Sequence, residues 1–313
     1  MSCDNPITVW RSRIGRDPIT GKWPIVFDRS KGYEDMQLEI PCGRCRGCRL
    51  ERSRQWAIRC VHEASLWPHN CFVTLTYDDD HLPPGGTLVK RDVQLFLKRL
   101  RKRFSGQKIR FYMCGEYGEL RSRPHYHIIF FNLDFPDKYL SPHKSRKRSF
   151  SLARKFPIYE SEILNELWPY GIATIGGVTF ETCAYTARYI MKKITGDIAE
   201  SYYQGRLPEY NCMSRKPGIA HDWYQSWKDD VYPHDYVVIR NGLKCRPPRY
   251  YDHLFELDDE KEFTKIKWRR KYKASKNPDN TYERRQVRIT VRDAKLTKLI
   301  RPLEIINNKL KLD

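Results

Sequence analysis

The sequence has no run of about 18 apolar residues, the length that a membrane-spanning helix needs. Its first segment, Met1–Gly15, has no apolar core of the kind found in a signal peptide. It also contains no Gly-x4-Gly-Lys-Ser/Thr phosphate loop. We therefore expect a protein that stays in a reducing cytoplasm, has no membrane partner, and relies on another protein for any ATP-driven unwinding.

Acidic residues are too few to balance the basic ones. The 313-residue chain has 58 Lys and Arg against 38 Asp and Glu, a formal net charge of +20. Three segments contain basic residues and no acid: 98–110 with seven, 144–155 with six and 265–276 with seven. Each run alone is typical of a solvated face, but aromatic residues interleave them, which favours phosphate contacts with base stacking. The composition predicts a nucleic-acid partner.

The segment Arg123–Phe131 is rich in aromatic and β-branched residues, a composition typical of a strand. Residues two apart on a strand face the same way, so His125 and His127 point to one side. Neutral imidazoles side by side can bind a divalent metal ion. Glu116 is a candidate third ligand, because Ile109–Gly115 also has strand character and could pair with the first strand as a hairpin. Two ordinary surface histidines are the alternative.

A helix is predicted around Tyr185–Lys193, where Ala, Met and Arg occupy helix-favouring positions. Tyr185 and Tyr189 are four residues apart, so they share one helix face, about 6 Å apart along the axis. Lys192 follows three residues after the second tyrosine and lies near the same face. A tyrosine pair at this spacing is also common in protein cores, so the pattern alone does not separate packing from chemistry.

The sequence has ten cysteines, and in a reducing compartment these are ligands or buried thiols rather than disulfides. Three form a run with glycines between them, which allow the tight turns of a metal knuckle; they are Cys42, Cys45 and Cys48. Cys60 is the expected fourth ligand of a tetrahedral zinc ion, with His62 as the alternative. Arg52 stands where a ferredoxin-type fourth cysteine would be, which disfavours an iron–sulfur cluster. Reduced free thiols are the other interpretation.

Together these segments resemble a known superfamily. The His-Tyr-His of His125–His127 resembles the metal motif of the HUH endonucleases. The Tyr-x3-Tyr-x2-Lys of Tyr185–Lys192 resembles the two-tyrosine motif of rolling-circle initiators in small icosahedral single-stranded DNA phages. Phe72–Tyr77 is similar to the apolar first-motif strand, and the three motifs follow the family's order. The resemblance covers Pro41 to Lys193 and is nearest to the initiators of gokushovirus-type microviruses.

The resemblance implies an α+β fold, with a ferredoxin-like core of five antiparallel strands and helices on one side. Periodicity predicts a compatible alternation, with helices near 50–66, 89–104 and 161–168 and strands at 72–77 and 171–178. With 40% hydrophobic residues, the chain can bury a core. We expect an irregular N-terminal extension at 1–40 with one hairpin, an endonuclease core at 41–196 that begins with the cysteine cluster, and a basic accessory region at 197–313.

The resemblance also implies the activity. Such an enzyme nicks the origin of a circular replicative form through a 5′-phosphotyrosine, frees a 3′-hydroxyl primer, and later rejoins the displaced strand into a circle. Tyr185 and Tyr189 would be the nucleophiles, and Lys192 would position the phosphate or lower a phenol pKa. A Mg²⁺ or Mn²⁺ ion would be held by His125, His127 and Glu116. Zn²⁺ is the physical competitor at a histidine-rich site.

The expected substrate is single-stranded or locally melted origin DNA, with a host DNA polymerase and helicase as further partners, in the cytoplasm of a bacterial host cell. Backbone contacts are expected from Arg101, Lys102, Arg123, Arg146, Lys147, Arg148 and Lys193. A relaxase or a single-strand transposase with the same chemistry is one alternative. A zinc-stabilised DNA-binding regulator with a structural histidine pair is the alternative outside enzymes.

Overall fold

The computed structural model describes residues 3–19, 21–118, 122–141, 157–188, 193, 198–276 and 281–297. The chain divides into two compact units: residues 1–52 with 272–299, and residues 53–271 with 300–313. Helices α1 (Arg46–Ala64) and α10 (Glu260–Ser275) each contain a boundary between the units. Within the described part of the chain, no helix combines the length and the apolar character needed to cross a membrane.

The first unit contains a three-stranded antiparallel sheet in the order β2-β1-β3. Its strands are β1 (Ile7–Ser12), β2 (Ile25–Val26) and β3 (Gly32–Ile40), and helix α11 (Tyr282–Thr297) belongs to the same unit. In the longest pairing, Ile7 lies opposite Ile40. The sequence predicted one hairpin here, whereas β1 pairs with strands on both of its sides.

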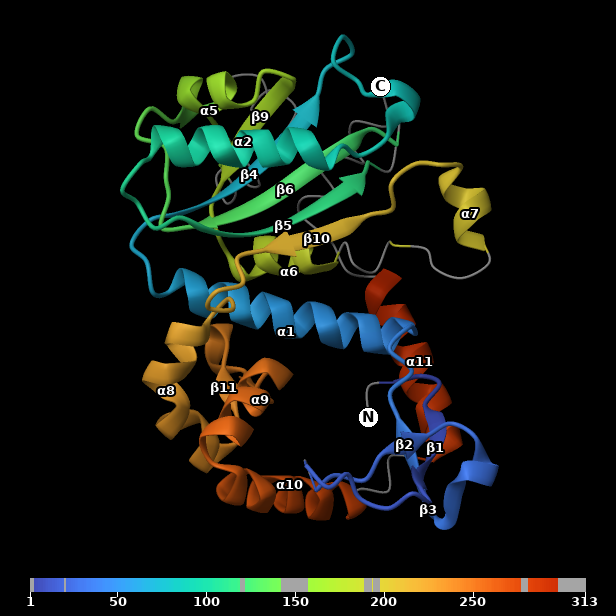
Figure 1. Cartoon of the computed structure of the whole chain (residues 1–313). Helices are drawn as coiled ribbons and strands as arrows, with labels where there is room; N and C mark the ends of the chain where they lie inside the picture. The colour runs from blue at the N-terminus through green and yellow to red at the C-terminus, as the bar shows by residue number, and fades with distance from the viewer. Residues whose placement is uncertain are drawn as a thin grey trace. The chain divides into compact units, whose positions relative to one another are not determined.

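The second unit is built on a seven-stranded antiparallel sheet in the order β10-β5-β6-β4-β9-β8-β7 (Figure 1). Its long strands confirm the predicted ones: β4 (Asn70–Tyr77), β5 (Arg110–Tyr117), β6 (Pro124–Phe131) and β9 (Gly171–Gly176). Three short strands complete it: β7 (Tyr139–Leu140), β8 (Tyr159–Glu160) and β10 (Tyr210–Met213). The predicted number of five strands was therefore wrong, because these short segments extend both edges.

Helices cover both faces of this sheet, so the prediction of helices on one side was also wrong (Figure 1). Val73 and Ile128 pack on one face with α2 (Lys90–Arg103) and α5 (Glu162–Leu167). Phe72 and Ile129 pack on the other with α1 and α6 (Phe180–Arg188). The reason is in the strands themselves: neighbouring residues of β4 and β6 are apolar on both faces, and each apolar face must be covered to exclude water.

The remaining helices of the second unit divide between the two cores. Helix α7 (Ile198–Tyr203) adds Tyr203 to the core that contains α2. Helices α8 (His221–His234), α9 (Arg249–Asp258) and α10 add aromatic side chains to the core that contains α1, and the two-residue strands β11 (Val237–Val238) and β12 (Lys244–Cys245) pair with each other.

An ion-pair network ties α10 to the helices before it. The Arg270 guanidinium donates to Asp252 at 2.7 Å and also pairs with Asp235. Asp252 is on α9, and Asp235 is the residue at which α8 ends. Since Arg270 is on α10, these bonds hold the three helices together.

Candidate active site and cysteine cluster

The hairpin of β5 and β6 places the predicted metal ligands on one face of the sheet. Glu116 lies directly opposite His125 in the register of these two strands. On the other side of β6, strand β4 sets Thr76 opposite His125 and Thr74 opposite His127. Side chains of directly opposed residues point the same way, so all five lie on the face that α6 covers.

Hydrogen bonds fix the orientation of both imidazoles. Thr74 Oγ1 lies 3.1 Å from His127 Nδ1, and Thr76 Oγ1 lies 3.0 Å from His125 Nδ1. His127 Nε2 lies 3.1 Å from Glu116 Oε1, and both side chains are buried. With Nδ1 held by a hydroxyl in each ring, Nε2 is the nitrogen that could ligate a metal.

The geometry of His127 and Glu116 fits a shared divalent ion. Two neighbouring ligands of an octahedral ion at about 2.1 Å lie about 3 Å apart, close to the 3.1 Å between His127 Nε2 and Glu116 Oε1. The His125 ring lies beside them, with its centroid 6.5 Å from that of His127. Two imidazoles and a carboxylate form a mixed nitrogen and oxygen donor set that first-row divalent ions accept.

A glycine makes room for the outer imidazole. A Cβ atom at Gly118 would lie 2.7 Å from His125 Nε2, closer than real contacts of this kind. The end of the β5–β6 hairpin therefore passes directly against the histidine ring. Any larger residue at position 118 would displace that ring.

Helix α6 brings Tyr185 to the histidines. The ring of Tyr185 meets that of His127 edge to face, with centroids 5.3 Å apart and an interplanar angle of 76°. Phe72 stacks on His127 at 5.6 Å and 8°. The helix start is fixed by reciprocal bonds, since Thr179 N–H donates to Thr182 Oγ1 at 2.9 Å and Thr182 N–H donates to Thr179 Oγ1 at 3.2 Å. Tyr185 is thus held about one turn into α6.

The other two residues of the tyrosine motif, Tyr189 and Lys192, lie outside the described residues. Lys193 is described and is exposed. Of the predicted catalytic and metal-binding groups, the structure therefore brings together Tyr185, His127, His125 and Glu116.

A cavity of about 290 Å³ lies alongside this site. Phe72 and Thr74 line it, and both residues contact His127. Further lining comes from β9 and the start of α6, with Thr174 and Thr182, and from Lys138. Half of the lining residues have polar or charged side chains, Asp134 among them, and the rest are apolar or glycine. Such a mixture can hold a flat heteroaromatic ring that also carries hydrogen-bonding groups.

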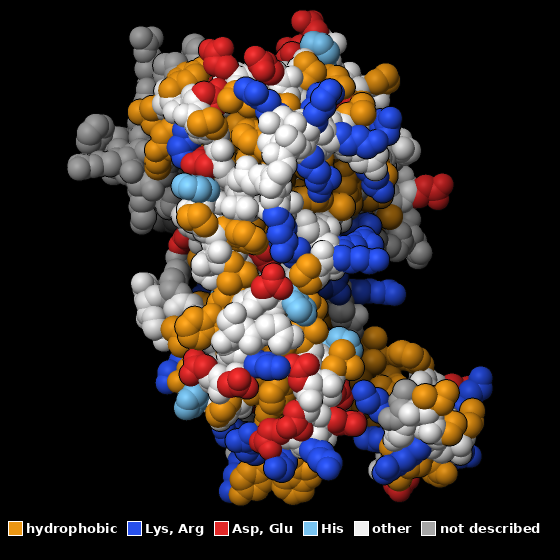
Figure 2. Space-filling view, turned by 60° about the vertical axis from the view of Figure 1, so that its left-hand side comes forward, with side chains coloured by type: hydrophobic (Ala, Val, Ile, Leu, Met, Phe, Trp, Pro, Cys, Tyr) orange, Lys and Arg blue, Asp and Glu red, His pale blue; other side chains and the backbone are white. Residues whose placement is uncertain are grey.

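The predicted DNA-contacting residues fall into three groups. Arg101 and Lys102 are exposed on α2. Arg123 is held by the protein itself, because its guanidinium donates to Tyr77 O at 2.8 Å and pairs with Asp79. The segment 146–148, with Arg146, Lys147 and Arg148, lies outside the described residues. Figure 2 shows Lys and Arg side chains gathered on the right-hand side of the upper part of the molecule.

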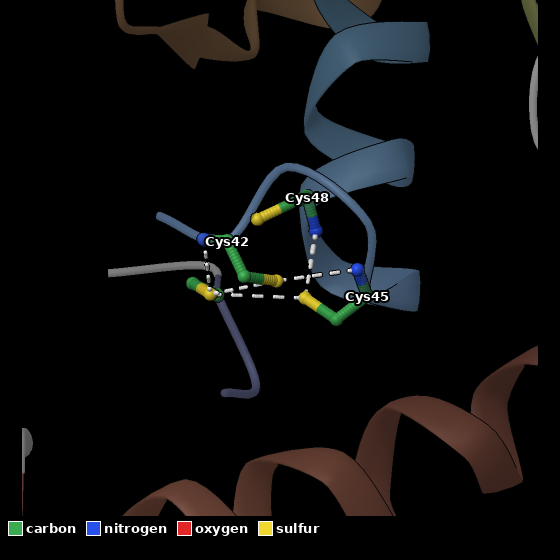
Figure 3. Close-up of side chains that lie close together, drawn as sticks. Cys42, Cys45 and Cys48 are labelled. Atoms are coloured by element: carbon green, nitrogen blue, oxygen red, sulfur yellow. Dashed lines mark hydrogen bonds between the residues drawn. The ribbon is translucent and has the colours of Figure 1, made fainter. Parts of the chain in front are cut away.

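Four cysteines of the first unit converge and could hold a metal ion. Their Sγ atoms all lie within 4.8 Å of one another, and they belong to Cys3, Cys42, Cys45 and Cys48. The Sγ atoms of Cys3 and Cys42 are 3.6 Å apart, and those of Cys3 and Cys45 are 3.8 Å apart. Figure 3 shows the side chains of the three labelled cysteines turned toward a common point.

The strand register explains why Cys3 is the fourth member. Ile7 pairs with Ile40 where β1 begins and β3 ends, so the residues just before β1 and just after β3 meet. Cys45 and Cys48 flank the first residues of α1. Cys3 was not predicted, because it approaches the other three cysteines only through the pairing of two strands that are about 30 residues apart along the chain. The one signal in the sequence was a cysteine just before a strand.

Backbone N–H groups point at the sulfurs. Cys42 N–H donates to Cys3 Sγ at 3.3 Å, Cys45 N–H to Cys42 Sγ at 3.3 Å and Cys48 N–H to Cys45 Sγ at 3.4 Å. Burial raises the pKa of Cys42, but the N–H groups of Cys45 and Arg44 outweigh it and lower the pKa to about 7. At Cys42 such donors stabilise the thiolate, the form in which cysteine binds metals, whereas burial raises the pKa of the Cys3 and Cys48 thiols.

The predicted ligand Cys60 and its alternative His62 are not part of this cluster. Both lie on the buried face of α1 in the core of the second unit. Burial raises the pKa of the Cys60 thiol, with Cys183 beside it. His62 Nδ1 lies 2.9 Å from the Tyr251 hydroxyl, and its ring stacks on Trp223 at 3.6 Å. The prediction was wrong because α1 continues past Cys48 and carries these residues into a different core.

Burial lowers the pKa of His62 to about 3 from an ordinary 6.5. The folded state therefore binds this proton less well than the unfolded state, so stability from this group is complete above pH 6.5 and is lost as the pH falls toward 3. We expect the free energy of unfolding to fall by about 1.4 kcal/mol per pH unit in this window because of His62. The urea concentration at the midpoint of unfolding should differ less between about pH 7 and about pH 5 in His62→Gln than in the unsubstituted protein. Equal pH slopes in both proteins would contradict the assignment.

Known proteins resemble this chain over most of its length. A family model described as replication-associated protein ORF2 matches residues 70–194, which include the hairpin and α6. Replication-associated protein VP4 of Bdellovibrio phage phiMH2K is 31% identical over 265 residues, which are 82% of this chain and 78% of the relative. Replication-associated protein ORF2 of Spiroplasma virus 4 is 33% identical over 248 residues, 76% of this chain and 73% of the relative.

A third relative, replication-associated protein ORF4 of Chlamydia phage 1, is 30% identical over 243 residues, 74% of this chain and 58% of the relative. No solved structure matches the chain. Sequence identity of at least 30% over most of the length of two relatives extends well beyond a shared motif. The chain therefore belongs to the family of replication-associated proteins of microvirus-type phages.

Proposed function

We propose that this protein initiates rolling-circle replication by nicking one strand of an origin through a covalent 5′-phosphotyrosine, and later rejoins the displaced strand into a circle. The observation that carries the proposal is the contact of the Tyr185 ring with His127, on the sheet face that also presents His125 and Glu116. Membership of a family named for replication supports an initiator that acts on DNA.

The phenol oxygen of Tyr185 or Tyr189 would attack the scissile phosphorus in line. The phenol loses its proton, and a P–O bond to its oxygen forms as the bond to the 3′-oxygen breaks. The 3′-oxygen takes up a proton and leaves as a hydroxyl. One phosphodiester replaces another, so a 3′-hydroxyl can reverse the step and reseal the strand without ATP. A second tyrosine one turn away can cut the regenerated origin while the first holds the old 5′ end. Lys192 would position the phosphate.

The proposed cofactor at the active site is Mg²⁺ or Mn²⁺, with His125, His127 and Glu116 as its ligands. When bound, such an ion supplies positive charge to a phosphate oxygen. The protein itself contributes the orientation: the hydroxyls of Thr74 and Thr76 hold the two imidazoles. A structural Zn²⁺ at the cysteine cluster is the second proposed metal.

The substrate would be single-stranded or locally melted origin DNA. Exposed cations on α2, including Arg101 and Lys102, suit its phosphates. The cavity beside Phe72 and Thr74 could accept an unstacked base next to the scissile linkage. The freed 3′-hydroxyl would prime a host polymerase, and a host helicase would separate the strands.

The test is a denaturing gel with an origin oligonucleotide labelled at either end, incubated with the protein and Mn²⁺. The 3′-labelled fragment should migrate with the protein, because its 5′ phosphate is attached to tyrosine, and the 5′-labelled fragment should be released with a 3′-hydroxyl. Salt-sensitive binding without any adduct in Mg²⁺, Mn²⁺ or Zn²⁺ would refute the proposal and favour a zinc-stabilised DNA-binding regulator.

A further inference from the structure

The first unit has almost no apolar core of its own. Among its described residues, only two apolar side chains are buried, those of Cys3 and Val9. Large apolar side chains of the same unit remain exposed, such as Ile14 at 95% and Phe27 at 67%. A unit of this size does not bury enough apolar surface to offset the conformational entropy of its chain. Small domains of this kind need another source of stability, commonly a metal ion or disulfides.

We propose that a zinc ion bound by Cys3, Cys42, Cys45 and Cys48 is the folding centre of the first unit and takes the place of the missing core. The site connects three elements of the chain, and β1 is far from the other two in sequence. Cys3 precedes β1, Cys42 follows β3, and the other two cysteines flank the start of α1. An ion there closes the open end of the sheet onto the helix.

The sulfur spacing favours a single tetrahedral ion. Four thiolates about 2.3 Å from one zinc ion lie about 3.8 Å apart, and the Sγ pairs Cys3–Cys42 and Cys3–Cys45 are 3.6 and 3.8 Å apart. A four-iron cluster holds each cysteine on a different iron, which spreads the sulfurs further than this. An all-sulfur tetrahedral set selects zinc over Mg²⁺ or Mn²⁺, which prefer oxygen ligands.

The same site supports the C-terminal helix of the unit. Asp4, next to Cys3, donates its backbone N–H to Cys45 Sγ at 3.2 Å, and its carboxylate accepts from Gly47 N–H at 3.1 Å. That carboxylate also pairs with Arg292 on α11. A second ion pair, Arg46 with Asp293 at 3.0 Å, joins the first turn of α1 to α11. Loss of the metal should therefore release α11 as well as the strands.

The second unit has a separate core on both faces of its sheet. Metal loss at the cysteines should therefore leave that unit folded. This distinguishes the inference from the proposed nuclease function, because either can fail without the other.

The experiment measures zinc in the full-length protein and in variants purified without added metal. We expect one zinc per chain. In Cys3→Ser the affinity for zinc should fall by more than the about 10- to 100-fold seen when a residue that only hydrogen-bonds to a metal ligand is replaced. Cobalt in place of zinc should give the intense visible bands of a tetrahedral cobalt thiolate, weakened in Cys42→Ser. Two controls should keep the zinc: Cys60→Ser, at the position that sequence spacing predicted, and His127→Ala, which tests for zinc at the histidine pair.

Limited trypsin digestion reports on folding. Removing zinc with a chelator should expose the arginines of α11 to cleavage at least about tenfold faster, while a fragment containing the seven-stranded sheet persists. Restoring Zn²⁺ should restore protection, and Mg²⁺ should not. Unchanged protection of α11 without metal, full zinc content in Cys3→Ser, or iron with inorganic sulfide in place of zinc would each overturn the inference.

Discussion

Replacing both Tyr185 and Tyr189 with phenylalanine should abolish the covalent adduct with origin DNA. The loss should be on the order of 10⁴-fold or more, because no phenol oxygen is left to attack the phosphorus and the covalent route is removed altogether. Either single variant should still form an adduct through the remaining tyrosine, but it should fail to release rejoined circles. The measurement is the amount of protein–DNA adduct and of circular product on denaturing gels.

The phenylalanine change is well suited to Tyr185. Its ring packs edge to face on His127 at 5.3 Å, and phenylalanine keeps that contact while removing only the hydroxyl. Loss of adduct would therefore not come from loss of this ring packing. Tyr202→Phe is the matched control, since this tyrosine is 47% exposed on another helix. An adduct that persists in the double variant would show that another group is the nucleophile.

His127→Ala and Glu116→Gln should each lower metal-dependent nicking by about 10²- to 10³-fold, the range seen when one group that stabilises transition-state charge is removed. The two groups contact each other at 3.1 Å, so they should act as one unit, and the double variant should be little worse than either single one. DNA binding should remain largely intact, because phosphate contacts on the basic surface supply it. Nicking rates across a Mn²⁺ titration and fluorescence anisotropy across a salt series measure the two properties.

Thr74→Val tests whether nicking depends on how the His127 ring is oriented, because the variant keeps the proposed metal ligands themselves. It removes the hydroxyl that holds His127 Nδ1 and should raise the Mn²⁺ concentration for half-maximal nicking by about 10- to 100-fold. The rate at saturating Mn²⁺ should change much less. His253→Ala, an exposed histidine on α9, is the control. A Thr74→Val enzyme with an unchanged Mn²⁺ requirement would contradict the proposed role of the hydroxyl.

Local patterns predict the elements of the site well. Alternating and β-branched residues predict strands where β4, β5 and β6 lie, and the strand period of two is enough to place His125 and His127 on one face. The hairpin that sets Glu116 opposite His125 follows from two neighbouring strands with a short connection. Each of these inferences needs only residues close together in the chain.

Contacts between distant segments of the chain determine the features that local sequence patterns did not predict. Cys3 and Cys42 meet because β1 and β3 pair, and no spacing rule contains that information. Nearness in sequence favours Cys60, yet the direction of α1 carries it into another core. Helices on both faces of the seven-stranded sheet could have been expected from β6, since its successive residues Ile128, Ile129 and Phe130 are all apolar and all buried.

Strand β10 has a practical consequence for any attempt to prepare a minimal nuclease. It comes from residues 210–213 and pairs with β5 along Tyr112–Gly115, outside the span 41–196 expected to hold the core. A fragment cut at residue 196 would leave the peptide groups on that side of β5, whose residues are all buried in the full chain, without their strand partner. Open edges of this kind recruit other copies of the same chain. Such a shortened protein would be prone to precipitate during expression, however complete its catalytic side chains.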